Sequence, residues 1–278
     1  MSRKISLIVL VLFATVVLAE KKPVYPTPQM PAYRVESRGF NDGQRDIKKL
    51  CDSTGRELWK LFPDYKIDKM VIKRGKGGPI TLYNRNSNGE IIIRLDTGNT
   101  LWCQYAYQFA HEFCHVLSGY DEDYKGNMWF EETLCETASL YAMRAMARSW
   151  KNDPPYKHWS NYRDELRSYS DKVIKGRTKV HEIYAKGLAG FYQAHKAELT
   201  KNACDRDLNG AMSLVFLKLF EESPESWGAI RWLNSTPSPK GETFEQYLTK
   251  WRNAAPKKHK PFIVKVAGLY GVTLAVAG

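Results

Sequence analysis

The stretch HEFCH, residues 111–115, contains the residue types best suited to bind a metal ion. Residues four apart in a helix lie on the same face, so the imidazoles of His111 and His115 would project side by side and could share one zinc ion. Glu112 would lie about 100° further around the helix, where it flanks the metal without competing for a coordination position. The competing interpretation is a partly buried helix whose histidines are satisfied by ordinary hydrogen bonds.

Such a zinc site could catalyse hydrolysis with a metal-bound water. Bound zinc lowers the pKa of a coordinated water towards 7, so a carboxylate such as Glu112 can accept its proton and pass it to a leaving amine. A catalytic zinc also requires a third protein ligand and one open position. The sequence must therefore supply another donor near the two histidines.

The elements around the motif are predicted to be helices. Aromatic and apolar residues recur at helical spacing from about Thr100 to Ser118, and Gly119 is a typical terminator. A second helix is predicted over Asn127–Trp150 and contains WFEETLCE. Glu132 and Glu136 would share one of its faces, whereas Glu131 would point elsewhere.

HEFCH followed by this acidic helix resembles the gluzincin group of zinc metallopeptidases, over about Ile91–Arg144. The resemblance implies that Glu132 is the third ligand of one zinc ion per chain. It also implies that Glu136 is an outer carboxylate that orients a histidine. The reverse assignment, with Glu136 as ligand and Glu132 in support, stays open, and Glu131 is the weakest candidate.

The resemblance gives the strand before the motif a role. Metallopeptidases of this type place an edge strand beside the zinc, and an extended substrate pairs with it through backbone hydrogen bonds. The segment EIIIRLDT, Glu90–Thr97, is the candidate for this strand. Its three isoleucines also fit a strand that simply packs in the core.

The two cysteines near the proposed ligands raise a separate hypothesis. Cys114 and Cys135 each follow a proposed ligand by three residues, on helices that must meet at the zinc. They could form a disulfide that clamps the helices, or they could be two small buried thiols. Five cysteines are too few for a disulfide scaffold, and at least one of an odd number stays free or pairs between chains.

The order of predicted elements indicates an α+β fold of the zincin type. A helix over 43–62 precedes three strands, at 66–74, 79–84 and 90–97, which we interpret as a small antiparallel sheet. From residue 100 onward the pattern is almost entirely helical, with further helices near 161–175, 179–201, 207–222, 224–233 and 243–254. We expect one domain, residues 43–278, sheet-containing over 43–99 and helical over 100–278.

The N-terminus has the layout of a secretory signal peptide. A basic start precedes an uncharged apolar run, Ile5–Ala19, which ends in small residues and is shorter than a typical membrane-spanning helix. We expect cleavage near Ala19, a secreted or periplasmic location and an extended leader over 20–42. An uncleaved membrane anchor is the alternative interpretation of the same run.

The composition narrows the class of partner. Hydrophobic residues make up 43% and charged residues 26%, which excludes wholesale disorder. The formal charge of +12 is spread along the chain, as on a solvated surface, although it could also hold the protein near acidic envelope polymers. Export argues against a nucleic-acid partner, and no stable membrane insertion is expected after signal cleavage.

These patterns together predict an exported zinc metallopeptidase that acts on a peptide or protein substrate, with Glu112 as general base and then acid. The alternative is a basic, envelope-associated binding protein that retains a zincin fold without catalysis. The presence of Glu112 favours the enzyme, because a site that has lost catalysis usually loses that acid first. The sequence leaves the substrate, the oxyanion-stabilising residue and the oligomeric state open.

Overall fold

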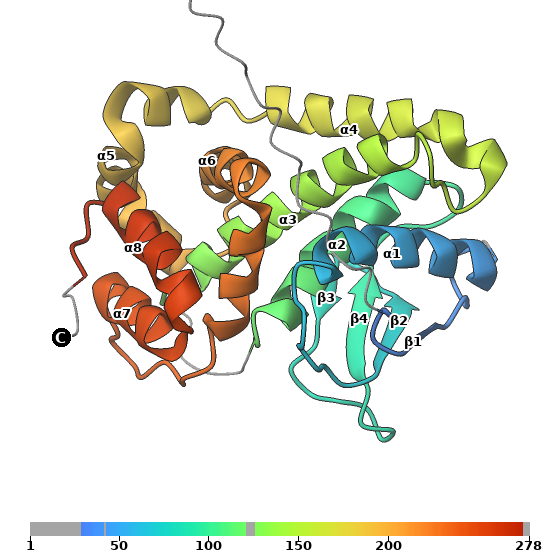
Figure 1. Cartoon of the computed structure of the whole chain (residues 1–278), viewed down its shortest axis with the longest axis horizontal. Coiled ribbons are helices and arrows are strands. Elements are labelled where there is room, and N and C mark those ends of the chain that lie inside the picture. Colours follow the sequence, from blue (N-terminus) through green and yellow to red (C-terminus); the bar gives the residue numbers. More distant parts are fainter. Residues whose placement is uncertain (1–28, 42, 121–125, 275–278) are drawn as a thin grey trace, which may run out of the picture.

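A computed structural model describes residues 29–41, 43–120 and 126–274 of the chain (Figure 1). The predicted signal peptide, residues 1–19, lies outside the described residues. In chain order the elements are β1 (Tyr33–Val35), α1 (Gln44–Trp59), β2 (Met70–Arg74), β3 (Ile80–Thr81), β4 (Ile91–Leu95), α2 (Trp102–Leu117), α3 (Met128–Ser149), η1 (Lys157–Tyr162), α4 (Arg163–Lys175), α5 (Val180–Lys201), α6 (Arg206–Glu222), η2 (Pro224–Trp232), α7 (Phe244–Ala254), η3 (Lys257–His259) and α8 (Lys260–Leu269).

The fold is α+β, with a small sheet and a larger helical part. Figure 1 shows the strands together with α1 and α2 on one side and α5 to α8 on the other, with α3 running between them. Helix α3 is buried along most of its length and packs against α1, α2, α4 and α6. This central position explains why its sequence, MWFEETLCETASLYAMRAMARS, shows no single apolar stripe: several helices cover it from different directions.

The sheet is mixed, so the predicted antiparallel arrangement is wrong. The strand order is β1-β2-β4-β3; β1 pairs with β2 and β2 with β4 in parallel, and only β3 pairs with β4 antiparallel. The first parallel pair follows from the β1-α1-β2 connection, because a helical crossover returns the chain in the same direction. Strand β1 lies within the segment predicted as an extended leader.

The sheet also differs from the prediction in its edge. The segment predicted as the edge strand contains β4, which lies between β2 and β3 inside the sheet. Strand β3, with only two residues, forms the edge next to β4 instead. In β4, Ile91, Ile93 and Leu95 are buried while Arg94 is exposed, so one face of the sheet packs on the helices.

The helices match the predicted pattern closely, because their apolar periodicity and terminators are local signals. Helix α2 ends before Gly119, whose φ of +69° is a left-handed conformation that favours glycine. Helix α5 is interrupted at Gly187, where φ is +71°. In the described part of the chain no helix combines the length and the apolar character needed to cross a bilayer.

Candidate metal centre

The packing of α2 against α3 brings the predicted metal-binding residues together. The aromatic face of α2, which includes Tyr105, Phe109 and Phe113, is buried in the core. This orientation turns His111 and His115 towards α3, and their ring centroids lie 5.2 Å apart. One side chain of α3, Glu132, faces both imidazoles.

The distances in this cluster fit a tetrahedral metal ion. Nε2 of His111 lies 3.2 Å from Oε2 of Glu132, and Nε2 of His115 lies 3.6 Å from Oε1 of the same carboxylate. Ligand atoms about 2.0–2.1 Å from a tetrahedral zinc are separated by roughly 3.4 Å. The three side chains could therefore hold zinc with little movement.

Cys135 gives a second possible donor in the same place. Donor atoms of His111, His115 and Cys135 lie within 4.8 Å of one another, so these three form a candidate metal-binding cluster. Cys135 is fully buried, however, and it does not line the cavity that the two histidines and Glu132 line. A site that must keep one position open to water is better completed by Glu132 than by Cys135.

Glu131 was the weakest ligand candidate, and in the structure it lies behind His115, on the Nδ1 side of the imidazole. Its Oε1 lies 2.6 Å from Nδ1 of His115 and accepts a hydrogen bond from Ser118 at 3.1 Å. Its Oε2 accepts from the side-chain amide of Asn234 at 2.7 Å. Such a carboxylate fixes the tautomer and ring orientation of a ligand histidine, leaving Nε2 free for the metal. No local sequence pattern indicates this role, because Asn234 lies 103 positions from Glu131 along the chain.

Glu136 was predicted to be an outer carboxylate that orients a histidine, and its hydrogen bonds are to Tyr107 and Arg177. Its Oε1 lies 3.9 Å from Nδ1 of His111, which is beyond hydrogen-bonding distance. Its Oε2 instead accepts from Arg177 at 2.8 Å and from the hydroxyl of Tyr107. Glu136 is therefore near the site but anchored to Arg177.

Glu112, the predicted base, lies beside the two histidines and is held by the sheet edge. The hydroxyl of Thr81 in β3 donates to Oε2 of Glu112 at 2.8 Å and to the Glu112 carbonyl oxygen at 3.0 Å. This fixes the carboxylate against β3, while it still lines the cavity. The edge strand thus positions a residue of the site, a contact between residues that lie 31 positions apart.

The charges of the cluster are strongly coupled without a metal. Burial, the largest single influence, disfavours a charged His115, but Glu132, Glu131 and Glu112 outweigh it and raise its pKa to about 10. Burial also disfavours a charged His111, but Glu132 and Glu112 outweigh it and raise its pKa. Burial likewise disfavours a charged Glu132, but the two histidines outweigh it and lower its pKa to about 2. In the metal-free protein, protons on the histidines thus balance the carboxylates, and a metal would replace them.

The cysteines are all free thiols, so the structure does not contain the proposed Cys114–Cys135 disulfide. The two side chains nevertheless lie together, since the pKa of the Cys135 thiol is raised by burial and by a hydrogen bond with Cys114. Cys204, which the sequence did not single out, lies at the site, with Sγ 3.5 Å from Oε1 of Glu132. Burial and the neighbouring Glu132 raise its pKa to about 12.

A cavity of about 920 Å³ opens beside the cluster. His111, Glu112, His115 and Glu132 line its floor. The edge strand and adjoining loop form one wall, and residues from α4, from α6 and from the chain before α5 and before α6 form the other. A cavity of this size lies in the range of sites that bind small ligands.

Comparisons with family models, with curated proteins and with solved structures found no match. Arguments about the function therefore rest on the geometry of the site.

Proposed function

We propose that this protein is a zinc-dependent metallopeptidase with one zinc ion per chain, bound by His111, His115 and Glu132. The observation that carries the proposal is the pair of Nε2 to carboxylate distances, 3.2 and 3.6 Å, at the floor of an open cavity. The donor set of two histidines and one glutamate is that of a catalytic zinc, which keeps a further position for water or substrate. Resemblance to gluzincins agrees with this donor set.

When bound, zinc would supply Lewis acidity and lower the pKa of a coordinated water towards 7. The protein's own residues would then move protons and hold the reacting groups. Glu112 would act as general base and return the proton to the leaving amine, and Thr81 would keep its carboxylate in place. Glu131 would hold Nδ1 of His115.

The wall formed by β3 supports a peptide as the substrate. Strand β3 pairs with β4 on one side only, so its other edge can pair with an extended backbone. Ile80, at 49% relative exposure, and Thr81 both line the cavity. A peptide lying along this edge would cross the floor beside Glu112.

The test compares the wild-type protein with Glu112→Gln and Glu132→Gln. Zinc content is measured on protein purified without chelator, and cleavage is followed by mass spectrometry of a mixed peptide library. Glu112→Gln is expected to retain zinc and to lose activity by about 100-fold or more, since proton transfer contributes roughly that much. Glu132→Gln is expected to lose both. Glu57→Gln, a buried carboxylate bonded to Ser149 and outside the cavity, is the control.

Two results would contradict the proposal. Wild-type protein that binds no zinc, even when zinc is added, would rule out the metal centre. Zinc-loaded protein that binds peptides but cleaves none of them would instead favour the alternative, a binding protein with a zincin fold. The location outside the cytoplasm and the signal peptide are part of the same proposal, and N-terminal sequencing of the exported protein tests them.

A further inference from the structure

Charged side chains are distributed unequally between the two walls of the cavity. The basic residues that line it are Lys172, Arg177 and Arg206, all on the wall formed by α4, α6 and the chain before α5. Among the residues that the structure describes, those that line the opposite wall at the sheet edge have no charged side chain: Gly77, Gly78, Pro79, Ile80, Thr81 and Tyr83. Within the described part of the chain, the cleft therefore has uncharged side chains on one side of the proposed metal site and basic side chains on the other.

Arg177 is a fixed part of the cationic wall. One guanidinium nitrogen donates to Glu136 at 2.8 Å and to Tyr107 at 3.1 Å, and the other donates to the carbonyl oxygen of Arg206 at 2.9 Å. The guanidinium lies against Gly210, where even a Cβ atom would come within 2.5 Å of it. Because Glu136 already neutralises Arg177, its main effect is to position the wall.

Lys172 and Arg206 supply the available charge. Both are exposed, and neither makes an ion pair with any residue that the structure describes. The carboxylates next to Arg206 in the chain, Asp205 and Asp207, do not line the cavity, and Asp205 caps α6 through the backbone amides of Asp207 and Leu208. Two unpaired cations thus face the cleft on one side of the metal cluster.

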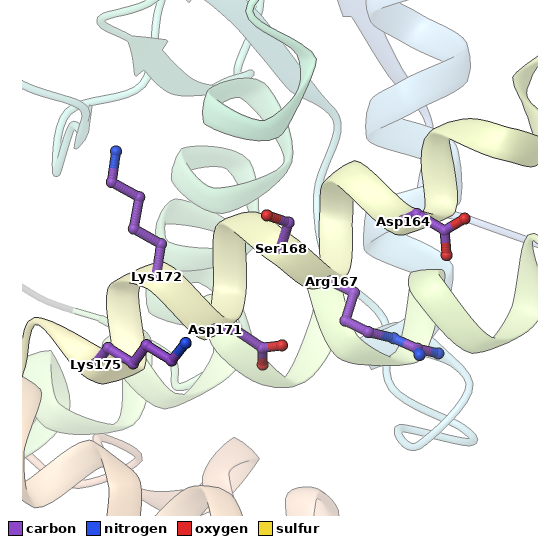
Figure 2. Close-up of a pocket in the computed structure, with 6 residues that line it drawn as sticks. All are labelled: Asp164, Arg167, Ser168, Asp171, Lys172 and Lys175. Carbon is purple, nitrogen blue, oxygen red and sulfur yellow. The ribbon is translucent and has the colours of Figure 1, made fainter.

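Of the two lysines in this turn of α4, Lys172 and Lys175, only Lys172 lines the site cavity. A second, shallower concavity of about 440 Å³ runs along the outer surface of this helix (Figure 2). Figure 2 shows Lys172 extending away from Asp171 and Lys175. Lys175 does not line the site cavity, so the same helical turn carries one lysine that faces the cleft and one that does not.

We infer that the cleft selects peptides with a carboxylate on the side of the scissile bond that faces α4 and α6, where Lys172 and Arg206 bind it. This inference rests on the proposed peptidase function and specifies its substrate class. A carboxylate placed there would be attracted by two cations, whereas the sheet-edge wall offers an extended backbone only hydrogen bonds and apolar contacts. The carboxylate can come from a peptide C-terminus or from an Asp or Glu side chain.

The experiment uses four versions of one fluorescent peptide: free or amidated at the C-terminus, each with Glu or Gln two residues from it. Binding is measured by fluorescence anisotropy with the zinc-loaded Glu112→Gln variant, which should not cleave the peptide. The value of kcat/KM is measured with the wild-type protein. We expect the peptides with more carboxylates to bind more tightly and to be cleaved faster. Exposed charge pairs predict about a two- to fivefold effect for each charge. The C-terminal and side-chain pairs of peptides show which carboxylate is recognised.

The variants Lys172→Met and Arg206→Gln test whether these two side chains bind the carboxylate. Each is made in the Glu112→Gln protein for binding and in the wild type for kinetics. Each is expected to reduce the ratio of kcat/KM for the acidic peptide to kcat/KM for the neutral peptide by about two- to fivefold. Lys175→Met is the matched control and should keep the wild-type preference. Added salt should reduce the preference in wild type and not in the double variant.

The outcomes separate this inference from the function on which it rests. Cleavage of all four peptides at equal rates would overturn the carboxylate preference and leave the peptidase function standing. A preference that survives in the Lys172→Met, Arg206→Gln double variant would also overturn it. If acidic peptides bind more tightly but the wild type cleaves none of the peptides, the proposed carboxylate binding stands and the peptidase function is overturned. If the peptides are neither bound nor cleaved, both proposals are overturned.

Discussion

The substitution Glu131→Gln tests whether the hydrogen bonds around the proposed ligand histidines set the metal affinity. Glu131 is buried and accepts hydrogen bonds on both oxygens, from His115 and Ser118 on one and from Asn234 on the other. A glutamine has one acceptor oxygen and one donor nitrogen. If its oxygen faces His115, its amide nitrogen meets the amide nitrogen of Asn234, and two donors face each other.

Rotation of Asn234 would not relieve this conflict. Its carbonyl oxygen already accepts a hydrogen bond from the hydroxyl of Tyr247 at 2.8 Å, which fixes the orientation of the amide. The network therefore matches a carboxylate and not an amide. Loss of a partner that orients a ligand histidine typically weakens metal binding 10- to 100-fold, so the expected cost is about 1.4–2.7 kcal/mol of binding free energy.

The assay is a competition titration of zinc against a chromophoric chelator at pH 7, with melting temperatures measured in excess chelator to separate folding from metal binding. Glu57→Gln is the matched control, because Glu57 is equally buried, accepts a hydrogen bond from Ser149 at 2.6 Å and does not line the cavity. If the zinc Kd of Glu131→Gln stays within about twofold of both wild type and Glu57→Gln, the reasoning about His115 is refuted.

Four further predictions concern the cluster. In the metal-free protein the pKa of His115 is raised from 6.5 to about 10, so zinc must displace a proton from it at pH 7. The zinc affinity should therefore rise with pH towards 10. Calorimetry in buffers of different ionisation enthalpy should detect at least one proton released per zinc bound. The same raised pKa stabilises the metal-free fold fully below pH 6.5, and this contribution should fade as the pH rises through 10 in chelator-containing melts. Cys135→Ser should keep zinc binding while Glu132→Gln abolishes it; the reverse result would make Cys135 the third ligand. Thr81→Val should lower kcat by about three- to tenfold, from one lost hydrogen bond to Glu112, with an unchanged zinc Kd; an unchanged kcat would show that this bond has no positioning role.

Local sequence signals determined the helices and the face on which the motif lies. The apolar spacing of α2 and the left-handed glycine at 119 depend on residues a few positions apart, so they can be read without knowing the fold. The same is true of the spacing of His111 and His115, which share a helix face in any globular context. The sequence also offered Glu112 within the motif and Glu131, Glu132 and Glu136 on the next helix as acidic candidates, and the choice of Glu132 among these three came from the resemblance to gluzincins.

Tertiary structure decided the strand directions, the edge strand and the surroundings of the ligands. Period-two patterns mark strands but do not encode their neighbours, so a segment expected at the edge, β4, lies inside a mixed sheet and β3 takes its place. Thr81 contacts Glu112, 31 positions away, and Arg177 contacts Glu136, 41 positions away. Glu131 contacts Asn234, 103 positions away. No periodicity records such pairs, because they arise only when separate helices and strands pack on one another.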